Sequence, residues 1–295
     1  MTWAGYPTAG HLLGDIGMDA EVTTPTTARV RSRVTPEVSA PDGGVRAGVL
    51  ATLVDVVGGA IGARALYPEW MATADLSISL VGPPVGPCVE ARGSLLRRGR
   101  TTLVVEALVA AVDEDGQDWV VDGRTADPVA WASMTFAVLP AREPGPSARM
   151  AAEVPDRWSF GGGRLGCSVL DALPVTVLDA GAGRVSVPVR PYLHNSFGAV
   201  QGGVIALVAE AAGAEALGAA QGRDGSAMVV TDLQIAYLAL GKVGPIVTSA
   251  RVLATGPDGR AGAVVELRDA GADDRLTTVV NVTAVPVDRT AGAAR

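Results

Sequence analysis

Cysteine, histidine and basic residues are scarce in this chain. Its 295 residues include two cysteines and two histidines, too few for a disulfide scaffold, and they form no metal-ligand cluster of the usual spacing. With 24 Lys and Arg against 31 Asp and Glu, the net charge is -7, so the chain offers no broad basic face to a nucleic-acid backbone. The sequence therefore predicts neither a metal site nor a nucleic-acid partner.

Long uninterrupted apolar runs are also missing. The most apolar stretch, residues 48–63, is interrupted by Asp55, and the N-terminus lacks the basic start and apolar middle of a signal peptide. We therefore expect a cytoplasmic protein without a membrane span. Hydrophobic residues still make up 48% of the chain, which is enough to build one large core or two modest ones.

The chain contains an internal repeat. Segment 42–60, DGGVRAGVLATLVDVVGGA, resembles segment 197–215, FGAVQGGVIALVAEAAGAE, and a shift of 155 residues places the carboxylate of Asp55 on that of Glu210. Later motifs keep the same order, because ADLSISL and TDLQIAY follow the two segments and each is followed in turn by VGP. This ordered match indicates a duplication.

The two copies are separated by a stretch in which Pro, Gly and charged residues replace the apolar pattern. We therefore predict an N-terminal domain over residues 1–140, a linker over residues 141–160 and a C-terminal domain over residues 161–295.

Exposed sheet edges and the apolar character of the chain also make a homo-oligomer possible.

Each copy is expected to contain one apolar helix followed by antiparallel strands. The expected helices, residues 45–66 and 200–220, are apolar on nearly every face and must therefore be covered on nearly every side. After the first helix, residues 88–116 show Val, Leu and Ala runs broken by polar turns, which is typical of an antiparallel meander. A curved antiparallel sheet around a buried helix meets both demands, so we predict the α+β fold class.

A loop and a helical acid in the second copy resemble those of a known family. Residues 195–203, NSFGAVQGG, followed by Glu210, are similar to the Asn-x-x-Gly-x-x-His-Gly-Gly loop and helical acid of hotdog-fold acyl-CoA thioesterases of the phenylacetate-pathway and 4-hydroxybenzoyl-CoA type. The resemblance covers almost the whole chain as two tandem hotdog domains. It implies an acyl-CoA thioester hydrolase, with coenzyme A as part of the substrate and no other cofactor. Gln201 stands where the family has its loop His.

Thioester hydrolysis needs a donor aimed at the carbonyl oxygen and a base or nucleophile on the other side of the carbon. The N–H of Gly202, at the start of a helix, suits the first role. Glu210 lies eight residues farther on, about 12 Å along the helix axis, so the acid must come from a different helix. The family pairs its helices antiparallel, which implies a complete site made of Asn195, Gly202 and Asp55.

The second site implied by this pairing is incomplete. Ala40 and Ala47 stand where the loop Asn and the first Gly would be, so the resemblance makes Glu210 the acid of a degenerate site. Some family members place a hydroxyl at the start of the strand after the helix, where it helps to hold the attacking water. The first copy has Thr73 at this position and the second copy has Val230.

Four further residues are candidates for substrate binding. Gln201 and Gly203 flank the proposed donor, and Arg98 and Arg100 could grip the phosphates of coenzyme A. Plainer alternatives stay open, because an arginine-rich turn can simply be solvated, and Asp55 can be a buried acid satisfied by hydrogen bonds. The loop residues can equally serve to cap or pack the helix.

The mechanism and two rival functions also stay open. Asp55 could activate a water or attack the thioester itself. An enoyl-CoA hydratase or dehydratase of the same fold would need a histidine paired with an acid, and neither expected helix contains a histidine. A non-catalytic acyl-CoA or acyl-carrier-protein binding module would bind its ligand without releasing thiol.

Overall fold

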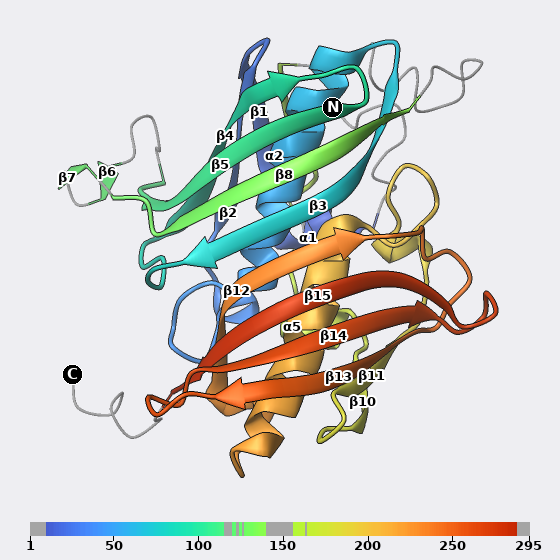
Figure 1. Cartoon of the computed structure of the whole chain (residues 1–295). Helices are drawn as coiled ribbons and strands as arrows, with labels where there is room; N and C mark the ends of the chain where they lie inside the picture. Colours follow the sequence, from blue (N-terminus) through green and yellow to red (C-terminus); the bar gives the residue numbers. More distant parts are fainter. Residues whose placement is uncertain are drawn as a thin grey trace.

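The computed structural model describes residues 10–114, 120–121, 124–125, 127–139, 156–162 and 164–287. A curved antiparallel sheet wraps around two long helices (Figure 1). The first half contributes α1 (Leu12–Ile16), β1 (Asp19–Thr24), β2 (Thr27–Arg33), η1 (Pro36–Val38), α2 (Ala47–Leu66), β3 (Trp70–Leu80), β4 (Cys88–Arg98), β5 (Thr102–Val112), β6 (Val120–Val121), β7 (Arg124–Thr125) and β8 (Ala130–Leu139). The second half contributes β9 (Arg157–Ser159), α4 (Val169–Ala172), β10 (Thr176–Asp179), β11 (Arg184–Val187), η2 (Pro191–Leu193), α5 (Gly202–Ala220), η3 (Gly225–Ala227), β12 (Met228–Tyr237), β13 (Ile246–Thr255), β14 (Ala261–Asp269) and β15 (Arg275–Pro286).

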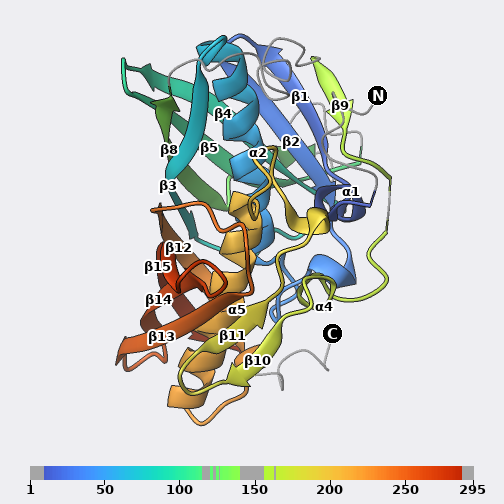
Figure 2. The same ribbon diagram turned by 90° about the vertical axis from the view of Figure 1, so that its right-hand side faces the viewer.

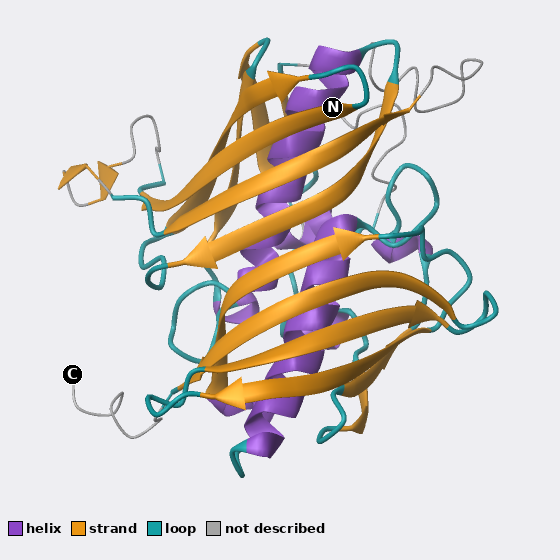
Figure 3. Ribbon diagram, viewed as in Figure 1, coloured by secondary structure: helices purple, strands orange, loops and turns teal. Residues whose placement is uncertain are grey.

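Strands from both halves form one continuous sheet of 13 strands, in the order β10-β11-β13-β14-β15-β12-β3-β8-β5-β4-β2-β1-β9. The halves join where β12 pairs with β3 in antiparallel register, with Leu233 opposite Ile78 (Figure 3). Both side chains are buried, so the junction belongs to the hydrophobic core. The core therefore runs from one half into the other without a break.

Helices α2 and α5 lie side by side within the curve of this sheet (Figure 2). Each begins two residues later than the sequence predicts and ends at the predicted residue. Both are long and apolar enough to cross a membrane by composition, yet 72% and 78% of their most apolar windows are buried inside the protein. Their apolar faces are covered by strands and by each other. The α+β fold class, with antiparallel strands around central helices, is confirmed.

Two glycines allow the helices to approach closely. A Cβ atom on Gly48 would lie 2.7 Å from the Cα of Leu207, and one on Gly203 would lie 2.5 Å from the Cα of Thr52. The partners run in opposite directions along the two helices, so the contact is antiparallel. As a consequence, the start of α5 faces the middle of α2, where Asp55 lies.

Part of the predicted linker, residues 141–155, lies outside the described residues. Residues 157–159 form β9, which pairs with β1 so that Trp158 lies opposite Ala20. The sheet thus ends in two short strands, β9 and β10, of three and four residues. The boundaries of the two domains and the homo-oligomer stay predictions.

Candidate functional site

A cavity of about 480 Å³ lies where the start of α5 faces α2. Its wall combines residues of both halves: Asp55 from α2, Thr73 from β3, Gly202 from α5 and Tyr237 from the end of β12. Most of the remaining lining residues are apolar, so a ligand held there would be largely removed from water. The antiparallel approach of the helices thus brings together groups that lie far apart in the sequence.

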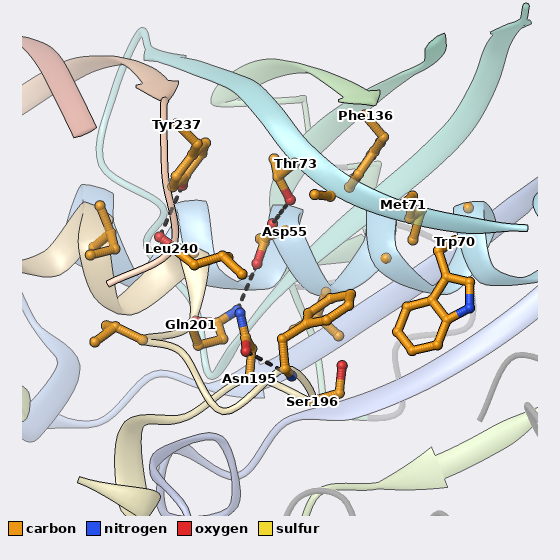
Figure 4. A pocket seen from close by; sticks show the side chains of 18 of the residues that line it. Asp55, Trp70, Met71, Thr73, Phe136, Asn195, Ser196, Gln201, Tyr237 and Leu240 are labelled. Carbon is orange, nitrogen blue, oxygen red and sulfur yellow. Dashed lines mark hydrogen bonds between the residues drawn. The ribbon is translucent and has the colours of Figure 1, made fainter. Parts of the chain in front are cut away.

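The carboxylate of Asp55 is held from two sides (Figure 4). The hydroxyl of Thr73 donates to its Oδ1 at 3.1 Å, and the Nε2 of Gln201 donates to its Oδ2 at 2.7 Å. Asp55 lies on α2, Thr73 lies on β3, and Gln201 is the residue immediately before α5. Asp55, Thr73 and Gln201 therefore form a hydrogen-bonded group that spans both halves of the chain.

Burial raises the pKa of Asp55 to about 6 from an ordinary value of 3.8. The hydrogen bonds from the Thr73 hydroxyl and the Gly203 backbone N–H favour the carboxylate and offset only part of this effect. The side chain retains partial exposure because it faces the cavity. A carboxyl group with such a pKa can accept and return a proton near neutral pH.

This pKa shift predicts that the ionised Asp55 destabilises the fold. Because the folded-state pKa lies above the unfolded one, the stability present below pH 3.8 should be lost as the pH rises through 6, by about 3 kcal/mol. Asp55→Asn removes the charge while keeping an oxygen for the Gln201 and Gly203 donors. Its free energy of unfolding, measured by urea denaturation, should exceed that of the wild type at pH 8 and approach it at pH 4. A constant difference across this range would contradict the shift.

Gln201 has two roles that come from its position before α5. Its Oε1 accepts from the N–H of Val204 at 3.0 Å and caps the helix, while its Nε2 holds Asp55. The side chain is 4% exposed, so both bonds are shielded from water. Sequence reasoning assigned Gln201 to substrate binding and missed its contact with Asp55. Its location immediately before a helix start indicates the cap on Val204, because that position favours a side-chain acceptor, but it does not indicate the bond to Asp55.

Gly202 lies beside Asp55 at the first position of α5. A Cβ atom there would be 3.0 Å from Oδ2 of Asp55, a crowded contact, so glycine lets the start of α5 approach the carboxylate closely. As a first-turn residue, Gly202 has an N–H without an acceptor inside the helix. Its carbonyl accepts from the hydroxyl of Tyr237 at 2.9 Å, a contact that sequence reasoning missed. Burial, and then the charge of Asp55, raise the pKa of Tyr237 well above its usual value, so this hydroxyl stays protonated.

Asn195 shapes the loop that precedes α5. Its Oδ1 accepts from the N–H groups of Phe197 at 2.9 Å and Ala199 at 3.1 Å. Gly198, with φ of 68°, completes the tight turn in a conformation that favours glycine. Asn195 also lines the cavity, together with Ser196. Its predicted contribution at a substrate carbonyl stays a prediction.

The second acid, Glu210, lies in a different environment. Its Oε2 accepts from the N–H of Gly48 at 2.7 Å, and its Oε1 pairs with the guanidinium of Arg46 at 3.2 Å. Arg46 occupies the position that matches Gln201 in the repeat, so a cation replaces the neutral amide. Burial raises the pKa of Glu210, and Arg46 and Gly48 offset part of that rise. Glu210 is 3% exposed and does not line the cavity of Asp55.

The remaining predicted residues lie outside the cavity wall. Gly203 packs against Thr52 and turns its N–H toward Asp55. Arg98 is exposed and forms an ion pair at 3.5 Å with Glu69, which does line the cavity. Arg100 is exposed and is not among the lining residues. Within the part of the chain that the structure describes, no group of three or more His, Cys, Asp or Glu residues is placed to hold a metal ion.

Comparisons with known proteins agree with this architecture. Residues 197–259, which include α5 and the strand after it, match the family model of the Thioesterase superfamily. The tesB protein of Mycobacterium avium subsp. paratuberculosis is similar in structure, with a TM-score of 0.58 at 13% identity, covering 91% of this chain and 96% of that one. An acyl-ACP thioesterase from Bacteroides thetaiotaomicron has a TM-score of 0.54 at 13% identity, covering 88% and 97%. The sequence matches no curated protein significantly. The chain thus has the hotdog fold of these structures.

Proposed function

We propose that this protein is an acyl-CoA thioester hydrolase with one composite site between its two halves. The observation that carries the proposal is the hydrogen-bonded group of Asp55, Thr73 and Gln201 beside the N–H of Gly202, all at the wall of an apolar cavity. The match to the Thioesterase superfamily and the similar structure named an acyl-ACP thioesterase support the reaction class. The remaining steps follow from the chemistry of these groups.

In the proposed reaction, Asp55 acts as a general base. A water held by the Thr73 hydroxyl and Asp55 attacks the thioester carbonyl carbon while its proton passes to the carboxylate. The tetrahedral intermediate collapses, the C–S bond breaks, and the thiolate leaves with the proton that Asp55 had taken. The products are a carboxylic acid and the free thiol of coenzyme A. Coenzyme A is therefore part of the substrate, and the proposal includes no further cofactor.

The N–H of Gly202 would stabilise the negative charge that develops on the carbonyl oxygen. It points from the positive end of the α5 dipole, and the glycine lets the thioester approach the backbone closely. The bond from Tyr237 to the Gly202 carbonyl holds the next peptide, between Gly202 and Gly203, and so restrains Gly202. In this proposal, the Gly202 N–H and the Asp55 carboxylate act from opposite sides of the thioester carbonyl carbon.

The rival lyase reaction lacks its acid-base partner here, because no histidine is found among the described residues that line the cavity.

A thiol-release assay with a panel of acyl-CoA esters distinguishes the hydrolase from a non-catalytic binding module. Release of coenzyme A by the wild type supports the proposal. Tight binding of acyl-CoA without thiol release by the pure protein would favour the binding module.

The contact between Gln201 and Asp55 gives a sharper prediction. Gln201→Leu should lower kcat by about tenfold or more, because Asp55 loses a donor that orients it and favours its charged form. The acid limb of the pH profile should also move to higher pH, which a purely structural role would not cause. The matched control is Gln221→Leu at the other end of α5, where the side chain bonds to the Gly259 carbonyl. Equal activity loss in both variants would contradict the assignment.

A further inference from the structure

Beyond Asp55, the cavity follows one face of α2. Asp55, Gly59 and Ala63 are spaced at four-residue intervals, so they lie in line on this face. All three line the cavity, and eight residues of helix correspond to about 12 Å. The cavity therefore continues for about two helical turns from the carboxylate toward the end of α2.

The other walls of this part are apolar. Met71 and Phe136 come from the sheet, and Trp70 packs against Phe197 with ring centroids 5.2 Å apart. The buried side chains of Leu13, Trp158 and Phe160 complete the lining. Among all the residues that line the cavity, the ionisable ones are Asp55, Glu69 and Tyr237. An anionic acyl group would therefore lose hydration without finding a cation among the residues that line the cavity.

Gly59 leaves part of this space open. A Cβ atom on Gly59 would have no heavy atom within 4 Å, whereas one on Gly58 would collide with Met134 and Phe136, and one on Gly62 with Met71. Glycine inside a helix costs about 1 kcal/mol relative to alanine, so packing alone would favour a larger residue at position 59. A side chain there would project into the cavity one turn from Asp55.

On the other side of Asp55 the cavity is more open. Leu238 and Leu240 line it and are 57% and 45% exposed, so this part opens to solvent. A substrate thioester held between Asp55 and Gly202 would then leave its coenzyme A portion on the open side. Its acyl portion would extend along α2.

We propose that the cavity along α2 binds an uncharged acyl chain of medium length, and that Gly59 determines how long a chain is accepted. This inference rests on the proposed hydrolase function and adds its substrate class. The length of the wall and its apolar lining determine the class of acyl chain, and the open space at Gly59 determines the longest chain that fits. Octanoyl-CoA represents the expected substrate, butyryl-CoA a shorter one, and succinyl-CoA a charged one.

The test compares kcat/KM for these thioesters in the wild type, Gly59→Ala and Gly59→Leu. The ratio of octanoyl to butyryl hydrolysis should fall by about tenfold or more in Gly59→Leu and by less in Gly59→Ala, since the added side chain occupies the space of the acyl chain. Gly82→Leu, in the turn at the far end of β3, also meets no atom within 4 Å and should leave the ratio unchanged. Circular dichroism checks the fold of each variant.

An unchanged ratio in folded Gly59→Leu overturns the inference, and so does a wild-type preference for succinyl-CoA over octanoyl-CoA. If Gly59→Leu does not fold, an unchanged ratio in Gly59→Ala overturns it equally. Wild-type protein that releases thiol from none of the esters contradicts the hydrolase function itself. Failure of the inference is therefore distinguished from failure of the function by the activity of the wild type.

Discussion

Asp55→Asn should lower kcat for thioester hydrolysis by a factor of about 10² or more. The amide keeps the shape of the side chain and can still accept from Gln201 and the Gly203 N–H, but it cannot accept a proton from water. In the wild type, the rate should fall as the pH drops through about 6, because protonation of Asp55 removes the base. Thiol release measured from pH 5 to 8 checks both the size of the effect and its pH dependence.

The matched control for this prediction is Glu210→Gln, since Glu210 is the equivalent acid of the other copy. Glu210 forms an ion pair with Arg46 and does not line the cavity, so the folded fraction of this variant should retain hydrolysis. An active Asp55→Asn protein beside an inactive Glu210→Gln protein would reverse the assignment. After a single turnover in water enriched in heavy oxygen, label in the Asp55 carboxylate would indicate direct attack, because a carboxylate that acts only as a base does not exchange its own oxygens.

Arg46→Met should lower the free energy of unfolding by about 3 kcal/mol, because it leaves the Glu210 carboxylate buried without its cation. The bond from the Gly48 N–H remains, but one backbone donor does not compensate a buried charge. Chemical denaturation of the variant beside the wild type measures the loss. The effect should shrink as the pH is lowered and Glu210 takes up a proton.

A second substitution tests the cause of that loss. Arg46→Met combined with Glu210→Met removes both charges and should recover most of the stability, since a buried ion pair can often be replaced by apolar groups of similar size. Recovery of the stability would show that the unpaired Glu210 carboxylate destabilises the single variant. An equal or larger loss in the double variant would instead indicate that the ion pair itself holds α2 against α5.

The repeat made the overall fold predictable. Because Asp55 and Glu210 fall at matching places in two apolar segments, the sequence indicated two equivalent buried helices, and their bounds agree with α2 and α5 within two residues. When a helix is apolar on nearly every face, its sequence shows that it is buried. The sequence does not show which face contacts which neighbour. The antiparallel pairing that brings Asp55 to Gly202 came from the family resemblance.

Much of the site could not be predicted, because it depends on contacts between distant residues. Gln201 and Asp55 are 146 positions apart, and the hydrogen bond between them requires the closest approach of the two helices. Tyr237 reaches Gly202 because β12 ends beside the start of α5. Arg46 and Glu210 are 164 positions apart, so their ion pair could not be predicted from the sequence either.

The union of both copies in one sheet has a consequence for how this molecule could diverge. In a pair of identical subunits, any substitution appears in both symmetry-related sites, so neither can be abandoned while the other is kept. Here β12 and β3 are joined within a single polypeptide, and each copy carries its own substitutions. One contact between the helices could therefore keep Gln201 beside Asp55, while the equivalent contact acquired Arg46 beside Glu210 and became purely structural.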